Sequence, residues 1–186
     1  MVKTLSSMIP LGTIAPDFTL LEPKSGEYKG LQELRGTSAT VVMFICNHCP
    51  FVKHITSELV LLANDYQNQG VAFVAINSND VEAYPDDSPE NMVLEAAAHG
   101  YPFPYLFDDT QQVAQAYHAV CTPDFFVFDA DLACVYRGQL DDSRPGNDIA
   151  VSGSDIRAAL NAVTTGNSVS ESQKPSVGCN IKWKNS

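Results

Sequence analysis

Two of the chain's five cysteines, Cys46 and Cys49, are separated by two residues and lie at the point where an apolar run ends. Residues 40–46 (TVVMFIC) are continuously apolar and rich in β-branched side chains, which predicts a strand buried on both faces. Over residues 50–68 apolar side chains recur at helical spacing, and the proline at position 50 suits a first helical turn. The motif CNHCP, residues 46–50, therefore lies where a buried strand gives way to a helix.

The rest of the body alternates in the same way. Residues 71–77 (VAFVAIN) predict a second buried strand, so the unit is strand, helix, strand, which is typical of a parallel pair with a crossover. We expect further elements, in chain order: a helix from Ser88 to His99, a short helix over Gln111–Tyr117, a hairpin of strands Phe125–Phe128 and Ala133–Arg137, and a helix from Ser154 to Val163. This order predicts the α/β class, with helices on both faces of a mixed sheet and small strands in an N-terminal extension.

The length of 186 residues suits one domain, which we assign to residues 1–165. After residue 165 the chain becomes polar and rich in turn-forming residues. Residues 177–183 (VGCNIKW) nevertheless carry the only tryptophan. We therefore expect residues 166–186 to form a C-terminal arm that docks on the same domain.

The charge balance narrows the choice of partners. There are 11 Lys and Arg residues against 22 Asp and Glu residues, a net charge of −11, which disfavours nucleic acid and anionic membrane surfaces. No stretch approaches the roughly 18 apolar residues of a membrane span. The first ten residues lack the apolar core of a secretory signal, so we expect a cytoplasmic protein. In that reducing compartment, a close pair among the five cysteines indicates a catalytic or metal-binding role rather than a structural disulfide.

The expected position of the CxxC pair favours redox chemistry. A helix N-terminus offers unpaired N–H groups and a positive dipole end, which lower the pKa of a cysteine from about 8.5 to roughly 3.5–7.5. We expect Cys46, on the strand side, to be the exposed attacking thiolate and Cys49 to resolve the mixed disulfide. His48 lies between them and, when protonated, would stabilise a thiolate; the alternative is a solvent-facing histidine with no tuning role.

A Thr-Pro pair strengthens the redox interpretation. Cys121, Thr122 and Pro123 precede the expected strand at Phe125, where a cis peptide bond would suit a tight turn. The order of elements resembles the thioredoxin fold, in which a cis-proline loop faces the dithiol. That resemblance implies that Pro123 is the cis-proline and that Thr122 offers its backbone to an incoming extended peptide. Cys121 is a candidate accessory thiol or, alternatively, a small buried side chain.

The N-terminal third adds a more specific resemblance. Residues 12–20 (GTIAPDFTL) and 31–36 (LQELRG) look like the opening of the redoxins, the superfamily of alkyl hydroperoxide reductases and thiol-specific antioxidants. With the CxxC and Thr-Pro motifs, the resemblance extends over about residues 12–165 and points to a thioredoxin-type CxxC branch, of which the closing GCNIKW (178–183) also looks typical.

The sequence departs from a peroxiredoxin at the peroxide site. A peroxiredoxin has the pattern Pro-x-x-x-Thr-x-x-Cys and a later arginine, which together bind the peroxide oxygens. Here Met43 stands three residues before Cys46, and Cys121 to Pro123 occupy the place of the arginine. Ile45 also replaces the tryptophan that precedes the first cysteine of thioredoxin. These departures disfavour efficient peroxidase chemistry and the usual thioredoxin clients.

The leading hypothesis is a thiol–disulfide oxidoreductase with an antioxidant role. It would need a protein or small-molecule disulfide or thiol substrate and an external reductant but no cofactor, as a monomer or homodimer. One alternative is a thiol peroxidase, in which Cys46 becomes a sulfenic acid that condenses with Cys49. A second is a metal-binding chaperone that uses Cys46, Cys49 and His48 or His54; a structural zinc site needs four ligands and no second cysteine pair appears, so we expect no metal. Cys134 is expected in the core, and Cys179 would reach the site only if the arm folds over it.

Overall fold

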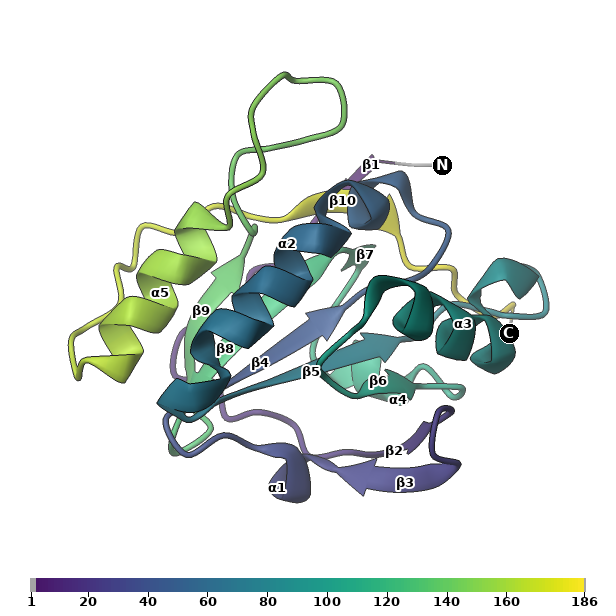
Figure 1. Cartoon of the computed structure of the whole chain (residues 1–186), viewed down its shortest axis with the longest axis horizontal. Coiled ribbons are helices and arrows are strands. Elements are labelled where there is room, and N and C mark those ends of the chain that lie inside the picture. Colours follow the sequence, from purple (N-terminus) through teal and green to yellow (C-terminus); the bar gives the residue numbers. More distant parts are fainter. Residues whose placement is uncertain (1–2, 186) are drawn as a thin grey trace.

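The computed structural model describes residues 3–185 and is built around a seven-stranded mixed sheet (Figure 1). Its strands, in spatial order, are β3 (Glu27–Gly30), β2 (Thr19–Glu22), β6 (Tyr105–Phe107), β5 (Val71–Asn77), β4 (Ala39–Phe44), β8 (Asp124–Asp129) and β9 (Cys134–Gly138). The strands β4, β5 and β6 are parallel, β8 pairs antiparallel with β4, and β9 pairs antiparallel with β8. The predicted mixed sheet and hairpin are confirmed.

The central strand β4 is buried along its whole length, as the apolar run predicts. Because successive side chains of a strand point to opposite faces, Val41 and Met43 pack in one core cluster while Val42 and Phe44 pack in the other. The strand ends at Phe44, two residues earlier than the apolar run. Ile45 N–H still donates to the carbonyl of Ile76 (3.0 Å), so the chain leaves the sheet just before the CxxC motif.

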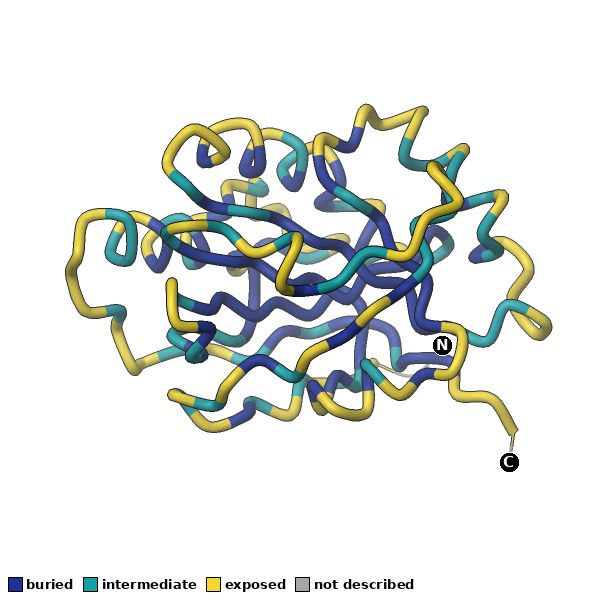
Figure 2. Tube along the Cα trace, turned by 90° about the horizontal axis from the view of Figure 1, so that it is seen from below, coloured by how far each residue is buried: buried dark blue, intermediate teal, exposed yellow. Residues whose placement is uncertain are grey.

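Helices cover both faces of this sheet, as predicted. On one face lie α2 (Pro50–Tyr66), α3 (Pro89–His99) and α5 (Ser154–Thr164); the other is covered by α1 (Leu31–Leu34), α4 (Gln112–Ala116) and the loops of the N-terminal extension. Two short 3₁₀ helices, η1 (Gln67–Gln69) and η2 (Pro85–Asp87), complete the set. Figure 2 shows the buried strands between outer layers of mixed exposure. The fold is therefore the predicted mixed α/β thioredoxin fold.

A second, three-stranded sheet joins the two ends of the chain to the middle. Its order is β1 (Lys3–Leu5), β10 (Val177–Asn180) and β7 (Cys121–Thr122), all antiparallel. Figure 1 shows β10 beside the start of α2, at the carboxyl end of β4. The segment expected as an arm thus contributes the middle strand of this small sheet. Among residues 3–185, no helix has the length and apolar character that a bilayer crossing needs.

Candidate functional site: a dithiol at a helix N-terminus

The CxxC motif forms the turn between β4 and α2. Cys49 is the N-cap residue of α2, and its carbonyl accepts hydrogen bonds from the N–H groups of Val52 (3.1 Å) and Lys53 (3.0 Å). Pro50 occupies the first helical position, where its missing N–H costs no hydrogen bond. The sequence thus places the second sulfur at the positive end of a 17-residue helix.

The Thr122–Pro123 loop faces both sulfurs. None of the five cysteines is in a disulfide bond, and the side chains of Cys46 and Cys49 are hydrogen-bonded to each other. The Thr122 hydroxyl lies 3.4 Å from Cys46 Sγ, and the Thr122 carbonyl oxygen lies 3.3 Å from Cys49 Sγ. The Thr122–Pro123 peptide bond is cis. Four of the residues singled out in the sequence therefore meet at one point.

Burial of the dithiol differs from the expectation. Cys46 is only 2% exposed and Cys49 is fully buried, so the predicted exposure of the first sulfur is wrong for this conformation. The physical reason is that β7 and β10 close over the sulfurs from one side while Asp87 holds the adjacent loop from the other. In this conformation the cover closes Cys46 off from solvent.

The pKa values of the two thiols shift in opposite directions, and Cys49 is the more acidic one. A hydrogen bond from the Cys46 thiol, opposed by burial and aided by contacts with Cys179 and the Val52 N–H, lowers the pKa of Cys49 to about 5. The same hydrogen bond, together with burial and the nearby Asp87 carboxylate, raises the pKa of Cys46 well above its ordinary value. Cys49 is thus the more acidic thiol of the pair, whereas the sequence analysis assigned the thiolate to Cys46.

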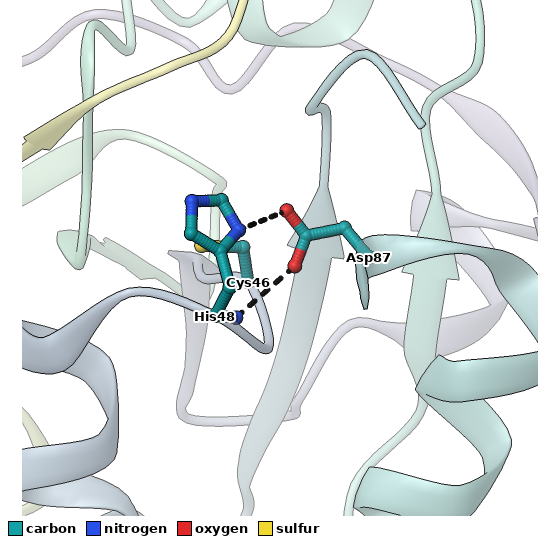
Figure 3. A group of neighbouring side chains, drawn as sticks. All are labelled: Cys46, His48 and Asp87. Carbon is teal, nitrogen blue, oxygen red and sulfur yellow. Dashed lines mark hydrogen bonds and ion pairs between the residues drawn. The ribbon is translucent and has the colours of Figure 1, made fainter. Parts of the chain in front are cut away.

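His48 is fixed by a carboxylate that sequence reasoning missed. Its Nδ1 lies 2.6 Å from Asp87 Oδ2, and its backbone N–H donates to Asp87 Oδ1 at 3.2 Å (Figure 3). Asp87 is fully buried; burial acts to raise the pKa of its carboxyl, but hydrogen bonds from His48 and Asn79 outweigh burial and lower it. His48 Nε2 is buried without a hydrogen-bond partner among the described residues. The ring therefore has one nitrogen committed to Asp87 and the other available near the dithiol.

Further hydrogen bonds hold the loop that carries Cys46. Asp87 Oδ1 accepts from the Asn47 N–H at 2.8 Å, and the buried Tyr105 hydroxyl donates to Asn47 Oδ1 at 2.9 Å. The Tyr84 ring stacks on His48 with ring centroids 5.3 Å apart. A surface hollow of about 420 Å³ begins beside Asn47 and His48 and extends along α3. This is the open side of the site.

A signal for part of this network was present in the sequence. Asn77 ends β5, the strand parallel to β4, and the carboxyl ends of parallel strands meet at one edge of a sheet. The polar residues that follow β5 therefore lie beside the CxxC turn, and Asn79 Nδ2 donates to Asp87 Oδ2 at 2.8 Å. Asp87 itself ends η2 before the predicted helix at Ser88, and its role carries no spacing signal.

The other three cysteines have different surroundings. Cys121 is buried in β7, and its thiol is directed to the Pro123 carbonyl (3.8 Å). Burial raises its pKa, and among residues 3–185 no hydrogen bond joins it to Cys46 or Cys49. Cys134 is buried in the core cluster on the opposite face of the sheet, as expected. Cys179, in β10, lies with its Sγ only 2.9 Å from Cys49 Sγ.

One group of described side chains has the spacing of metal ligands. Donor atoms of Cys46, His48 and Asp87 all lie within 4.8 Å of one another. The Asp87 oxygens already accept hydrogen bonds from neighbouring N–H groups, so a metal ion would have to replace them. His54, the other histidine considered from the sequence, is bonded to Ser143 Oγ at 2.7 Å.

Two solved structures match nearly the whole chain. An uncharacterized conserved protein from Geobacillus kaustophilus is 62% identical with a TM-score of 0.98, the match covering 100% of this chain and 98% of that one. A hypothetical protein from Sinorhizobium meliloti 1021 is 50% identical with a TM-score of 0.96, covering 98% of this chain and 100% of that one.

More distant matches share the fold. A structure described as a putative thiol:disulfide interchange protein DsbE from Chlorobium tepidum is 23% identical with a TM-score of 0.64, covering 82% of this chain and 99% of that one. No curated protein matches. The family model "AhpC/TSA family" matches residues 11–137, more than half of the chain, and the protein therefore belongs to the AhpC/TSA family, the redoxin group that the sequence motifs predicted.

Proposed function

We propose that the protein is a thiol–disulfide oxidoreductase that works through Cys46 and Cys49. The observation that carries the proposal is the hydrogen-bonded thiol pair at the N-terminus of α2, which faces the Thr122–Pro123 loop. Membership of the AhpC/TSA family and the shared fold with the interchange protein from Chlorobium tepidum support it. The cytoplasm and a protein or small-molecule disulfide remain the proposed setting and substrate.

The chemistry follows from the position of one proton. Transfer of the Cys46 proton to the Cys49 thiolate, along their hydrogen bond, makes Cys46 the nucleophile. Cys46 Sγ then attacks a substrate disulfide, forms a mixed disulfide and expels the first substrate thiolate. Cys49 loses its proton, attacks Cys46 Sγ and releases the second substrate thiolate. The enzyme is left as the Cys46–Cys49 disulfide, and an external thiol reductant restores it.

His48 is proposed as a positioning residue for this step. The Asp87 carboxylate fixes its ring, and a positively charged His48 would favour movement of the negative charge from Cys49 to Cys46. The surface hollow beside Asn47 and His48 offers the shortest approach for a substrate. The backbone of Thr122, which the sequence analysis assigned to binding an extended peptide, is paired with Cys179 of β10. A peptide would pair there only after β10 leaves.

A thiol peroxidase is the second candidate, favoured by the family match and by the Thr122 hydroxyl beside Cys46. Peroxide reduction by this family pattern uses an arginine at the thiol. The four arginines of the chain are bonded elsewhere: Arg35 to the Ala130 carbonyl, Arg137 to Ile9 and Gln173, Arg144 to Gln139 and nearby carbonyls, and Arg157 to Glu58 and Asp65. This distribution favours disulfide exchange over peroxide reduction.

Turnover of insulin disulfides and of hydrogen peroxide separates the two candidates. We expect the wild type and Cys134→Ala, a core cysteine remote from the site, to reduce insulin and to consume peroxide slowly. Cys46→Ser is expected to lose insulin reduction, and Cys49→Ser to accumulate mixed disulfides that mass spectrometry can identify. Fast peroxide consumption with insulin untouched, or full insulin reduction by Cys46→Ser, would refute the proposal.

A further inference from the structure

Cys179 is a third thiol placed against the dithiol by the C-terminal strand. Its Sγ lies 2.9 Å from Cys49 Sγ, whereas a disulfide bond is about 2.04 Å long, so the two sulfurs need to approach by roughly 0.9 Å to bond. Both residues are buried, and they come from elements 130 positions apart in the chain. The pairing of β10 with β7, which places Cys179 opposite Thr122, holds the two sulfurs in this contact.

The backbone of β10 is adapted to bring Cys179 this close. Gly178, the preceding residue, has no side chain, and a Cβ atom there would lie 2.0 Å from the Thr122 carbonyl oxygen and 2.5 Å from its carbon. Both atoms belong to the backbone that faces the dithiol, so they cannot move aside as a side chain would. Any residue larger than glycine at position 178 would therefore push β10 away from the Thr122–Pro123 loop and from Cys49.

We propose that Cys179 exchanges with the Cys46–Cys49 disulfide and forms an internal Cys49–Cys179 disulfide. This inference rests on the proposed function, which supplies the oxidised dithiol. Cys179 loses its proton and attacks Cys49 Sγ; the Cys49–Cys179 bond forms, the Cys46–Cys49 bond breaks, and Cys46 leaves as a thiolate that takes up the proton. The protein stays oxidised by two electrons throughout, so the step needs no further oxidant or reductant.

The exchange has two consequences for the site. It returns Cys46 to the thiol state while the oxidised protein still holds one disulfide. It also bonds β10 covalently to the N-terminus of α2, which fixes the strand over the edge of Thr122. The C-terminal strand then acts as an internal redox partner of the dithiol, in the position that an external thiol substrate would take beside Cys49.

Peptide mapping distinguishes the two disulfides directly, because the tryptic sites separate the thiols. Cys46 and Cys49 fall in the peptide of residues 36–53, whereas Cys179 falls in residues 158–182. A Cys46–Cys49 disulfide therefore stays within one peptide, and a Cys49–Cys179 disulfide links two.

The full-length protein is oxidised with one equivalent of oxidised glutathione, and thiols are then alkylated at acidic pH. We expect wild type and Cys134→Ala to give the linked pair 36–53 and 158–182, with Cys46 alkylated. Cys46→Ser, which cannot form the other disulfide, should give only the linked pair. Cys179→Ser should lose it and keep Cys46 protected within the 36–53 peptide.

Gly178→Ala provides a second variant with the thiol retained. It should lose the linked pair while circular dichroism shows the wild-type fold and the Cys46–Cys49 disulfide still forms. If wild type and Cys46→Ser both lack the linked pair although wild type forms the Cys46–Cys49 disulfide and reduces insulin, the inference is overturned and the proposed function stands. If no Cys46–Cys49 disulfide forms in any variant, the proposed function fails first.

Discussion

Asp87→Asn is the substitution that most directly tests the network behind the CxxC loop. The carboxylate is fully buried and accepts four hydrogen bonds: from the N–H groups of Asn47 (2.8 Å) and His48 (3.2 Å), from His48 Nδ1 (2.6 Å) and from Asn79 Nδ2 (2.8 Å). An asparagine keeps one acceptor oxygen, but its NH₂ group then faces two donors. Hydrogen bonds to a charged group contribute about 1.5–3 kcal/mol each, so the loss of two lowers the free energy of unfolding by at least about 3 kcal/mol.

The pH dependence of this loss identifies its cause. The pKa of Asp87 is lowered in the folded state, so its contribution to stability is fully present above the unfolded value of about 3.9 and is lost as pH falls through the folded value. The difference in unfolding free energy between wild type and Asp87→Asn should therefore shrink as the pH is lowered from about 5 towards 3.

Urea denaturation at neutral and acidic pH measures both effects. In thermal denaturation at neutral pH, a loss of about 3 kcal/mol should lower the melting temperature by roughly 6–12 °C, since each kcal/mol corresponds to about 2–4 °C for a chain of this size. The matched control is Asp86→Asn, because the neighbouring side chain is exposed and should stay within about 0.5 kcal/mol of wild type. A loss below about 1 kcal/mol for Asp87→Asn, or one that does not shrink in acid, would show that the carboxylate does not carry the network.

Three further predictions concern other buried groups. Asp124 is buried with Oδ2 unpartnered among the described residues, and burial raises the pKa of its carboxyl well above the ordinary value. The stability of Asp124→Asn relative to wild type should therefore increase as pH rises from about 5 to 8. A difference in unfolding free energy that stays constant over this range in urea denaturation would contradict the prediction. In the reduced protein the ultraviolet thiolate absorbance should titrate near the Cys49 pKa of about 5. Cys46→Ala, which removes the hydrogen-bond donor, should move that midpoint upward, and an unchanged midpoint would place the charge elsewhere. Tyr105→Phe removes the hydrogen bond to Asn47 Oδ1 and should cost about 1–3 kcal/mol in thermal denaturation, whereas Tyr28→Phe, at an exposed position, should cost almost nothing.

Local patterns predicted the scaffold of the site because each of its elements is coded within a few residues. The β-branched run before Cys46, the proline at position 50 and the apolar spacing of the following helix each agree with β4 and α2. The three-residue β6 (Tyr105–Phe107) was missed because it is too short to show an alternation of apolar and polar side chains, and it lies between prolines and turn residues. The strands β7 and β10 were missed for the same reason, since long-range pairing rather than propensity defines them.

The electrostatics of the site depended on such long-range contacts. A helix N-terminus alone predicted a thiolate at the motif but could not decide which sulfur carries it, because the deciding donors come from Cys179 and from the Cys46 thiol itself. Burial of Cys46 was likewise invisible, since the cover is built from β10 and from Asp87, which lie far away in sequence. Thr122, in contrast, was placed correctly beside the sulfurs by the resemblance to the thioredoxin fold.

The position of the charge has a consequence for reactivity. Thiolate nucleophilicity falls with pKa, and a buried Cys49 thiolate with a pKa of about 5 is stabilised by the contacts that make it a weak attacker. Cys46 is the better nucleophile once deprotonated, yet its raised pKa keeps it protonated while Cys49 holds its donors. Removal of Cys179 from beside Cys49, by displacement of β10, takes away one donor and favours transfer of the charge to Cys46. The same displacement would uncover the backbone of Thr122, so under the proposed mechanism one strand couples opening of the site to activation of Cys46.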